Sequence, residues 1–414
     1  MRAEIISVGT ELLLGQIIDT NAPYLGKVLS ALGIDVYYRA TVGDNNTRLA
    51  DTLKTALGRA DIVITIGGLG PTQDDLTKET IAEVLNEHMI MDPVSEESLR
   101  RFFDIRGLRI ADSNLKQALI PESGMAVPNS MGTAPGIIVD KDGKIVIALP
   151  GPPNEFIPMI DNSIVPYLSG KTASSPSVIK SRVLRVIGIG ESAAEEMIKS
   201  LLSSSNPSIA PYAKSAEVHF RITAKASDNQ TAFRMIDELD RKSREILGDY
   251  VYGVDEETLE SVVVDMLRRK GLKLALAESC TGGLISNRIT NIPGSSEVFL
   301  AGIVSYSNEA KTSFLNVSAE LIKANGAVSP EVAKAMAEGA RESTGADIAV
   351  SVTGIAGPDG ATPEKPVGLV YIGFCAKEGA YAEKSIFGGS RQDIKYRTSQ
   401  TALNMIRKHI MSHE

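Results

Sequence analysis

The start of the chain alternates regularly between apolar segments and segments with the spacing of an amphipathic helix. The predicted elements are, in order, strand 4–9, helix 21–32, strand 35–42, helix 48–57 and strand 62–66. Strands that alternate with helices over short, glycine-containing connections are typical of a parallel, doubly wound α/β sheet. Ligands of such sheets bind beyond the carboxyl ends of the strands. The loops after residues 9 and 66 are therefore the first places where a site is expected.

The length and composition are those of a multidomain globular protein. The 414 residues are too many for one hydrophobic core, and about three domains are expected. A net charge of −8 argues against general binding to nucleic acid or to anionic membranes. No apolar run approaches the ~20 residues that span a bilayer, and the N-terminus lacks the pattern of a cleavable signal peptide. We therefore expect a cytoplasmic protein without a membrane partner.

Cysteine and histidine are too sparse for most metal centres. Cys280 and Cys375 cannot form a disulfide framework or a cysteine-rich zinc site. The histidines are scattered along the sequence, so a histidine-based metal site is not expected. They are His88, His219, His409 and His413.

A glycine-rich loop with two aspartates follows the third predicted strand. Residues 67–77 have the sequence Gly-Gly-Leu-Gly-Pro-Thr-Gln-Asp-Asp-Leu-Thr. The glycines allow backbone amides to approach an anion closely, and Asp74 and Asp75 are suited to a hard cation such as Mg²⁺. The alternative is that one aspartate simply caps a helix that begins at Leu76. Two aspartates beside three glycines favour a phosphate and metal site. Two further candidate metal ligands are Glu11 and Glu79.

Two more segments rich in glycine and proline flank a predicted hairpin. Residues 129–136 precede strands 137–140 and 144–149, which are joined by the turn 141–143, and residues 150–155 follow. So much glycine and proline at strand ends suggests a shaped rim around one pocket, although turns alone could explain it.

These motifs resemble the molybdopterin-binding-like domain of the CinA (competence/damage-inducible) family. The matching segments are Gly-Gly-Leu-Gly-Pro-Thr-Gln-Asp-Asp, Gly-Thr-Ala-Pro-Gly and Leu-Pro-Gly-Pro-Pro-Asn-Glu. The resemblance implies a MogA-like α/β fold for residues 1–170. It also implies a metal-dependent ADP-ribose pyrophosphatase that yields AMP and ribose 5-phosphate, in which a divalent ion on carboxylates neutralises the diphosphate and activates water. Related domains bind molybdopterin instead, so a binding module without turnover is the alternative.

Several residues of this chain are implied as ligands of that site. The expected ADP-ribose-binding residues are Asn21, Gly67, Gly68, Gly70, Thr72, Gly132, Thr133, Pro150 and Gly151. The expected ligands of the divalent cation are Glu11, Asp74, Asp75 and Glu79.

A stretch of small residues, 169–177, predicts a domain boundary. The elements expected after it are strand 178–187, a helix from about Glu191 to Leu202, strands 208–212 and 217–224, and helix 230–247. This β-α-β-β-α unit, residues 171–253, resembles the small KH-like α+β middle domain of the same family. Its segment Gly188-Ile189-Gly190-Glu191 is not a Gly-x-x-Gly clamp, and the glutamate would repel phosphate. A spacer or dimerisation role is therefore favoured over nucleic-acid binding.

In the last third of the chain, a hydroxyl and a thiol lie side by side at a strand-to-helix turn. Residues 275–283 have the sequence Ala-Leu-Ala-Glu-Ser-Cys-Thr-Gly-Gly, between an apolar strand, 272–277, and a segment with helical spacing, 284–292. Unpaired amides and the helix dipole favour negative charge there, which suits a nucleophile, an oxyanion or a phosphate. Small polar residues and glycines are also what ordinary turns use, which is the alternative.

Lys311 is the candidate general base for Ser279. A predicted strand, 302–306, leads into a helix with Asn308 as a plausible N-cap, and Lys311 falls in the first turn. The helix dipole and partial burial both lower a lysine pKa, as proton removal from a serine requires. The alternative is a solvated surface lysine. Cys280 is the rival nucleophile, but a cysteine enzyme would want a nearby imidazole, and this segment has histidines only in its C-terminal tail.

Two other loops of this segment carry candidate binding groups. Residues 353–360, Thr-Gly-Ile-Ala-Gly-Pro-Asp-Gly, follow an apolar strand and have free amides that could hold a phosphate. After strand 367–376, residues 387–393 place Arg391 before the last predicted helix, with Arg397 further along it. Arginines in such positions suit a fixed phosphate, or they merely solvate the helix.

Together these segments resemble the C-terminal domain of the CinA family, a nicotinamide-nucleotide amidohydrolase. The matching segments are Ala-Glu-Ser-Cys-Thr-Gly-Gly, Ser-Tyr-Ser-Asn-Glu-Ala-Lys, Thr-Gly-Ile-Ala-Gly-Pro-Asp-Gly, Glu-Lys-Pro-Val-Gly and Gly-Ser-Arg. The resemblance implies an α/β domain over residues 254–414 that converts nicotinamide mononucleotide (NMN) to nicotinate mononucleotide and ammonia without a cofactor. It also implies a homodimer. A nucleic-acid-associated competence factor is the alternative for the whole chain.

The resemblance also implies roles for individual residues. Ser279 is the nucleophile, Lys311 its base, and Tyr306 assists proton transfer or orients the lysine. Amides near Thr281 and Gly282 would stabilise the oxyanion, worth roughly 3–4 kcal/mol per donor. Thr353 is a fourth catalytic candidate, which would hold the carboxamide or the 5′-phosphate. The remaining residues expected to bind NMN are Thr281, Gly282, Gly283, Gly354, Arg391 and Arg397.

Overall fold

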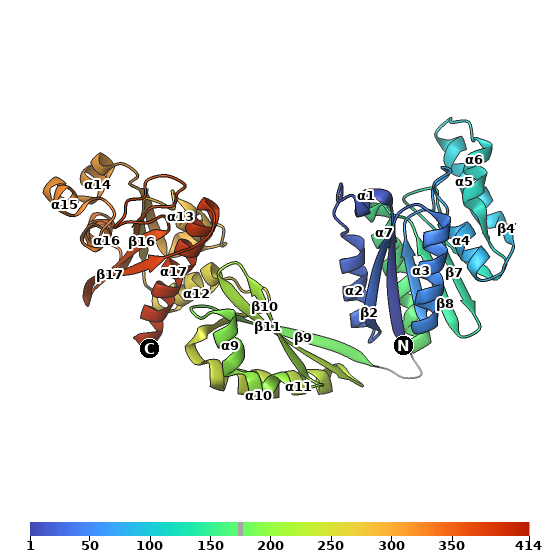
Figure 1. Ribbon diagram of the computed structural model, residues 1–414, viewed down its shortest axis with the longest axis horizontal. Coiled ribbons are helices and arrows are strands. Elements are labelled where there is room, and N and C mark those ends of the chain that lie inside the picture. Colours follow the sequence, from blue (N-terminus) through green and yellow to red (C-terminus); the bar gives the residue numbers. More distant parts are fainter. Residues whose placement is uncertain (173–176, 414) are drawn as a thin grey trace. The chain divides into compact units, whose positions relative to one another are not determined.

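The computed structural model describes residues 1–172 and 177–413. They form two compact units, one of residues 1–180 with 224–235, and one of residues 181–223 with the chain from Ile236 onward. Figure 1 shows helices packed against β-sheets in three successive parts of the chain. Within the described ranges, no helix combines the length and the apolar character that crossing a bilayer requires.

The N-terminal domain follows the predicted alternation of strands and helices. Its first half contains β1 (Arg2–Val8), α1 (Thr10–Leu13), α2 (Asn21–Ala31), β2 (Asp35–Val42), α3 (Asn46–Arg59), β3 (Ile62–Ile66), α4 (Thr77–Val84), β4 (Met89–Met91) and α5 (Pro93–Ile105). Its second half contains α6 (Asp112–Leu115), η1 (Lys116–Ala118), β5 (Leu119–Pro121), β6 (Gly124–Val127), β7 (Gly136–Lys141), β8 (Lys144–Leu149), α7 (Pro153–Met159), η2 (Ile160–Ile164) and α8 (Val165–Thr172).

The main sheet of this domain is covered by helices on both faces, as the doubly wound prediction requires. Its strand order is β2-β1-β3-β8-β7-β6. Adjacent residues of β1 enter different cores, because side chains alternate across a strand. Ile5 packs with Leu25 and Leu29 of α2, whereas Ile6 packs with Leu49 and Leu53 of α3.

Two details of the N-terminal prediction need correction. The sheet is not wholly parallel, because the predicted hairpin β7–β8 and strand β6 add antiparallel pairs to the parallel strands β1, β2, β3 and β8. The predicted linker is partly helical, since α8 continues through residues 169–172; residues 173–176 of that linker lie outside the described residues. The hairpin turn is as predicted, with Asp142 and Gly143 at positive φ.

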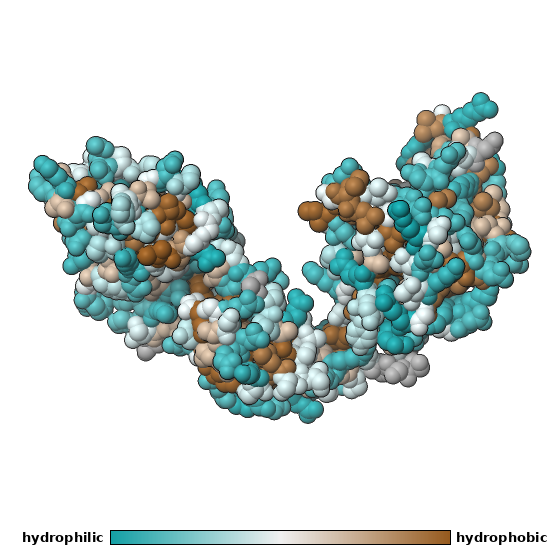
Figure 2. Space-filling view, viewed as in Figure 1, coloured by the Kyte–Doolittle hydropathy of each residue, from teal (hydrophilic) through white to brown (hydrophobic). Residues whose placement is uncertain are grey.

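The surface carries an apolar patch at α1 and the turn after it (Figure 2). Its exposed side chains are Leu13, Leu14, Ile17 and Ile18. The patch begins two residues after Glu11, one of the candidate metal ligands.

The middle domain is a four-stranded sheet with helices, ordered β10-β11-β9-β12. Its elements are β9 (Val178–Val186), α9 (Glu191–Met197), α10 (Lys199–Leu202), β10 (Ser208–Lys214), β11 (Glu217–Ala226), α11 (Asn229–Leu247), η3 (Gly248–Tyr250) and β12 (Val251–Val254). The helix expected from Glu191 to Leu202 is interrupted at Ile198, whose backbone is not helical. Strand β12, which was not predicted from the sequence, pairs antiparallel with β9.

The C-terminal domain repeats the pattern of parallel strands followed by an antiparallel extension. Its strand order is β14-β13-β15-β16-β17, with β13 parallel to both β14 and β15, and with β16 and β17 antiparallel. Its elements are α12 (Leu259–Lys270), β13 (Leu274–Glu278), α13 (Leu284–Thr290), η4 (Ser295–Glu297), β14 (Phe299–Val304), α14 (Asn308–Leu315), α15 (Ala319–Asn325), α16 (Pro330–Thr344), β15 (Ile348–Gly354), β16 (Leu369–Ala376), β17 (Gly379–Ile386) and α17 (Arg391–Ser412).

Helices cover both faces of this sheet as well. Leu276 of β13 packs in a core with α12, α13 and α17, whereas its neighbours Ala275 and Ala277 face a second core with α14, α15 and α16. The buried β13 therefore ends in the centre of the domain, and Ser279 follows it directly.

Candidate functional site

The Ser279 turn lies at the carboxyl end of β13. The Ser279 amide donates to the Val352 carbonyl (3.0 Å), which extends the pairing of β13 with β15 by one residue. The chain then leaves the sheet through Gly282 and Gly283, whose left-handed backbone (φ 62° and 94°) strongly favours glycine. The turn holds Ser279 in a buried position, 9% exposed.

The buried carboxylate of Glu278 holds the start of α13. It accepts hydrogen bonds from the amides of Gly283 (3.0 Å), Ile285 (3.1 Å) and Ser286 (2.8 Å) and from the Ser286 hydroxyl (2.7 Å). These are amides that a helix start leaves without intrahelical partners. Because the carboxylate occupies them, Gly283 does not present a free amide to NMN in this conformation. This role of Glu278 was not predicted from the sequence.

The amide of Gly282 is also engaged. It donates to the Ser279 carbonyl (3.1 Å) and closes the turn. The expected oxyanion stabilisation by this amide is therefore not available in this conformation. Thr281 differs, because its buried hydroxyl has no hydrogen-bond partner among the described residues. A bound polar group could satisfy that hydroxyl.

Lys311 meets Ser279 inside the protein. Its Nζ lies 3.2 Å from the Ser279 Oγ, and the residue is 1% exposed. The Nζ also donates to the carbonyls of Ser305 (2.9 Å) and Tyr306 (3.3 Å), which fix its direction. The solvated alternative for this lysine is therefore wrong. The N-cap of α14 is Ser307, which accepts from the Ala310 amide, and not Asn308 as expected.

Burial favours the neutral form of Lys311. Desolvation lowers the pKa of its ammonium group from the ordinary value of 10.5, and it outweighs the opposing influence of Cys280 and Glu309. A neutral amine beside a hydroxyl can accept the hydroxyl proton. The geometry and the direction of the pKa shift therefore agree with the role of a general base.

Cys280 lacks the properties of a nucleophile. It is 6% exposed and belongs to the hydrophobic core under β13. Burial raises the pKa of its thiol to about 12, so the reactive thiolate is scarce near neutral pH. These observations favour Ser279 over its neighbour.

Ser305 was not singled out from the sequence, yet it connects the two halves of the pair. Its amide donates to the Glu278 carbonyl (2.9 Å), and its carbonyl accepts from Lys311. Its hydroxyl is buried and has no hydrogen-bond partner among the described residues. Its position directly after β14, next to β13, was the available signal.

Tyr306 and Arg391 contact each other at the surface of the same domain. The Arg391 guanidinium donates to the Tyr306 hydroxyl (3.4 Å) and to the Gly357 carbonyl (2.7 Å). Tyr306 is 62% exposed, and its carbonyl, not its phenol, contacts Lys311. The structure thus brings together two of the predicted loops and the end of the strand predicted over residues 302–306.

Thr353 and Gly354 have contacts within the fold. The Thr353 hydroxyl donates to the Ala327 carbonyl (2.7 Å) and is buried. Gly354 pairs with Val370 in the sheet, and a Cβ there would meet the Leu369 carbonyl oxygen at 2.7 Å. The structure gives both residues a structural role, and their expected contacts with NMN stay predictions.

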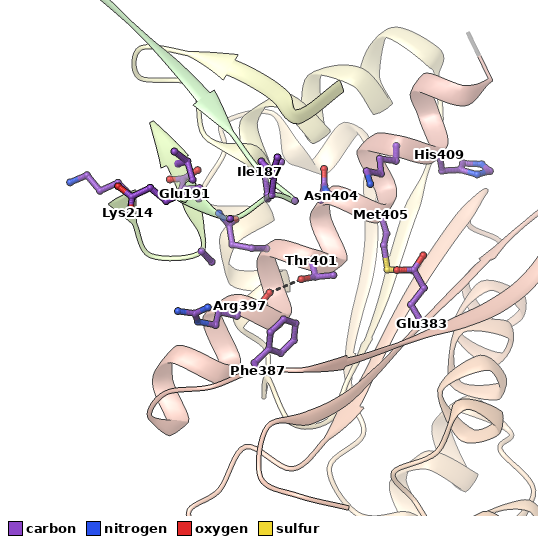
Figure 3. A pocket seen from close by; sticks show the side chains of 18 of the residues that line it. Ile187, Glu191, Lys214, Glu383, Phe387, Arg397, Thr401, Asn404, Met405 and His409 are labelled. Carbon is purple, nitrogen blue, oxygen red and sulfur yellow. Dashed lines mark hydrogen bonds between the residues drawn. The ribbon is translucent and has the colours of Figure 1, made fainter. Parts of the chain in front are cut away.

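Arg397 takes no part in the contacts of Arg391 with Tyr306 and Gly357. It lines a cavity of about 730 Å³ together with residues of the middle domain, among them Glu191 and Lys214, and with Thr401 and His409 of its own helix (Figure 3). Another cation is nearer the Ser279 turn: a Cβ added to Gly282 would lie 3.8 Å from the Lys395 Nζ. Lys395 is one helical turn after Arg391, a spacing that was visible in the sequence.

The second candidate site is a cavity of about 400 Å³ at the carboxyl ends of the N-terminal strands. It brings together the predicted glycine loop and both other rim segments. Its lining includes the predicted residues Glu11, Gly67, Gly68, Gly70, Asp74, Asp75, Thr133, Pro150 and Gly151. Two carboxylates that were not predicted, Asp44 and Glu155, also line it.

The five carboxylates around this cavity do not converge on one point. Among the described residues, only another group, in the C-terminal domain, brings three or more metal-ligand atoms within 4.8 Å of one another. Mg²⁺, however, is usually held by one or two carboxylates together with substrate phosphates and water. The hard oxygen donors therefore fit a cation that arrives with a diphosphate, and they do not fit a protein-only metal cage.

The aspartates of the glycine loop differ in their contacts. Asp75 accepts from the amide (3.0 Å) and hydroxyl of Thr72, so it shapes the loop, and neither aspartate caps α4. Hydrogen bonding to Thr72 lowers the pKa of Asp74, which is exposed. The glycines allow close contacts, since a Cβ at Gly67 would meet the Val8 carbonyl oxygen at 2.3 Å.

Glu79, a predicted metal ligand, is not among the residues that line the cavity. Its carboxylate is 3.3 Å from the Lys116 Nζ, although not aligned as a hydrogen bond, and that ammonium donates to the Asp75 carbonyl (2.9 Å). The preceding residue, Lys78, is 2% exposed, and burial lowers its pKa to about 8. It donates to the Lys116 carbonyl. A buried lysine here was not foreseen.

Three predicted ADP-ribose-binding residues support the cavity without being part of its lining. Asn21 donates to the Gly151 carbonyl (2.7 Å), and Thr72 holds Asp75. Gly132 lets Glu155 approach, because a Cβ there would lie 2.1 Å from its carboxylate oxygen.

Family models match three successive parts of the chain. Residues 4–170 match a probable molybdopterin binding domain, residues 181–253 the damage-inducible protein CinA KH domain, and residues 256–410 the CinA C-terminal domain. The fold is thus that of a mixed α/β protein with a MogA-like domain, a KH-like domain and a third α/β domain that carries the Ser–Lys pair. The chain belongs to the CinA family.

Two relatives of similar length support this assignment. A "putative competence-damage inducible protein" of Thermoanaerobacter pseudethanolicus is 50% identical over 411 residues, which cover 99% of each chain. One with the same name from Caldicellulosiruptor saccharolyticus is 51% identical over 414 residues, 100% of each chain. The crystal structure of the competence/damage inducible protein CihA from Agrobacterium tumefaciens is 42% identical and covers 36% of this chain and 92% of its own, with a TM-score of 0.36.

Proposed function

We propose that the protein is a bifunctional hydrolase of pyridine-nucleotide salvage. Its C-terminal domain hydrolyses the carboxamide of NMN to nicotinate mononucleotide and ammonia. The observation that carries this proposal is the buried pair of Lys311 Nζ and Ser279 Oγ, 3.2 Å apart. The N-terminal domain hydrolyses ADP-ribose to AMP and ribose 5-phosphate with a divalent cation.

The C-terminal reaction starts with proton transfer from Ser279 to the neutral amine of Lys311. The serine oxygen attacks the carboxamide carbon, and the tetrahedral intermediate expels ammonia, which takes its proton from the lysine. Water then attacks the acyl-enzyme, with Lys311 again as base, and releases the carboxylate. Thr281, whose hydroxyl is unpartnered, is a donor for the developing oxyanion. No cofactor takes part.

In the N-terminal cavity, the glycine loop would hold the diphosphate, and Asp74 and Glu11 would hold the cation. Such a cation neutralises phosphate charge and lowers the pKa of bound water. The neighbouring carboxylates Asp44 and Glu155 orient water and loop residues. We also propose that the protein is a cytoplasmic homodimer that does not bind nucleic acid.

The decisive experiment is release of ammonia from NMN by the full chain and by Ser279→Ala. The proposal expects turnover in the wild type and its loss in the variant. Unchanged turnover in the variant would exclude Ser279, and no turnover in the wild type would exclude the activity. ADP-ribose hydrolysis measured in the same samples reports on the other domain and on folding.

A second function for the N-terminal domain is binding of molybdopterin or a nucleotide without turnover. The dispersed carboxylates and the match to a probable molybdopterin binding domain favour it. Co-purified pterin fluorescence, together with no cleavage of ADP-ribose at millimolar Mg²⁺, would decide for this alternative.

A further inference from the structure

The end of α17 brings two imidazoles to one carboxylate. His409 and His413 are one helical turn apart, and both face Glu378 in the turn between β16 and β17. The Nε2 of His409 lies 3.8 Å from one Glu378 oxygen, and the Nε2 of His413 lies 4.0 Å from the other. The ligand atoms of all three residues lie within 4.8 Å of one another, the one such group in the described residues. Two of the four histidines, His409 and His413, thus lie together at the end of α17.

The hydrogen bonds of the His413 Nδ1 leave the other ring nitrogen, Nε2, free to bind a ligand. Its Nδ1 lies 2.8 Å from the His409 carbonyl oxygen, which can only accept. In the neutral ring the proton is therefore on Nδ1, and Nε2 keeps its lone pair on the side of Glu378. A ring N–H bonded to a backbone carbonyl is the usual outer support of a metal-binding histidine. The Ser412 hydroxyl also contacts this Nδ1 (3.0 Å).

The His409 ring is held by packing. It lies against the Phe374 ring with centroids 4.7 Å apart, and against the His413 ring with centroids 4.3 Å apart. Figure 3 shows His409 at the edge of the large cavity, with its ring directed away from it. The cluster therefore lies at the rim of this cavity through His409, and it shares no residue with the Ser–Lys pair or with the N-terminal carboxylates.

We propose that Glu378, His409 and His413 form a binding site for a divalent transition-metal ion of the zinc type. Zinc bonds of about 2.0–2.1 Å in a tetrahedron separate ligand atoms by about 3.4 Å, close to the 3.8 and 4.0 Å observed. Two imidazoles and one carboxylate suit zinc, nickel or copper, whereas magnesium and calcium prefer oxygen ligands alone. Water completes the coordination of the exposed site. The bound ion fastens the β16–β17 turn to the end of α17.

The test is a titration of the full chain with zinc, in which calorimetry measures binding. Excess Mg²⁺ is present throughout, so that Mg²⁺ occupies the N-terminal carboxylate cavity. The variants are His413→Gln and Glu378→Gln, both at exposed positions, and the control is His88→Gln, an exposed histidine of the N-terminal domain. We expect one zinc ion to bind this site in the wild type and in the control. Binding in either cluster variant is expected to be weaker by at least about tenfold.

Two further readouts separate metal ligation from a general effect on folding. Cobalt(II) bound by the wild type is expected to give the visible absorption of a four-coordinate ion, which His413→Gln loses. Zinc is expected to raise the melting temperature of the wild type and not of the variants. Equal zinc affinity and equal spectra in the wild type and both variants would overturn the proposal.

Discussion

The N-terminal and C-terminal domains place their candidate sites in the same position on similar sheets, yet the two sites are built differently. In each, parallel strands continue into antiparallel ones, and the site follows the carboxyl ends of the parallel strands. In the C-terminal domain, Ser279 and Lys311 are buried and in contact. In the N-terminal domain, carboxylates surround an open cavity without converging. The fold itself assembles the buried serine–lysine pair, whereas in the N-terminal domain it leaves an open space between its carboxylates.

The largest effect that tests this contrast is expected from Ser279→Ala. Loss of the nucleophile should lower ammonia release from NMN at least about a thousandfold. ADP-ribose hydrolysis by the same sample should not change. Cys280→Ala is the matched control, because its thiol is buried and its pKa is raised to about 12. If that control loses as much activity as Ser279→Ala, the nucleophile is misassigned.

Removal of divalent cations should have the opposite selectivity. EDTA is expected to slow ADP-ribose hydrolysis at least about a hundredfold and to leave NMN hydrolysis unchanged. Asp74→Asn should raise the Mg²⁺ concentration needed for half-maximal rate, because Asp74 lines the cavity and is exposed. If cleavage of ADP-ribose persists in EDTA, the N-terminal site does not depend on a cation, and the proposed contrast with the C-terminal site is wrong.

The pH dependence should identify Lys311 as the group that titrates. As the pH falls through the lowered pKa of this lysine, its amine becomes protonated and cannot accept the serine proton. The NMN rate should therefore rise with pH, with a midpoint below 10.5, the ordinary lysine pKa. Lys311→Met should lower kcat by about 10²–10⁴. A rate profile that keeps its midpoint in this variant would assign the titration to another group.

The smallest expected effect comes from Glu278→Gln. This variant tests how far the Ser279–Lys311 pair depends on the hydrogen bonds that Glu278 accepts at the start of α13. The Glu278 carboxylate accepts hydrogen bonds from the backbone amides at the start of α13. The NH₂ group of a glutamine can only donate, so at least one of these hydrogen bonds is lost. The protein should therefore lose about 1–3 kcal/mol of stability. Thermal melting and NMN kinetics are the measurements. We expect a lower melting temperature with a modest loss of kcat. Glu297→Gln, which changes an exposed acid of the same domain, should alter neither.

Much of this molecule could be predicted because its strands are buried and apolar. β3, β13 and β15 are nearly continuous apolar runs, and the loops after them contain the predicted sites. The Ser279–Lys311 pair could be predicted because parallel neighbouring strands end at the same edge of the sheet.

Other features depend on tertiary contacts that local sequence does not encode. Lys78 has an ordinary helical position, and only packing makes it 2% exposed. Glu278 was seen as part of a motif, but its four hydrogen bonds depend on how the turn folds back. Ser307 and Asn308 are both suitable caps, so the start of α14 was ambiguous by one residue.

The register between β13 and β14 has a consequence for how this chain could be rearranged. Glu278 of β13 pairs with Val304 of β14. Ser279 directly follows Glu278, and Ser305, whose carbonyl binds Lys311, directly follows Val304. Their separation is set by the ladder and not by the 25 residues of chain between them. New termini or an inserted segment near residue 294 should leave the positions of Ser279 and Ser305 unchanged. Deletion of a single residue inside β13 or β14 would shift one of these two serines by about 3.3 Å.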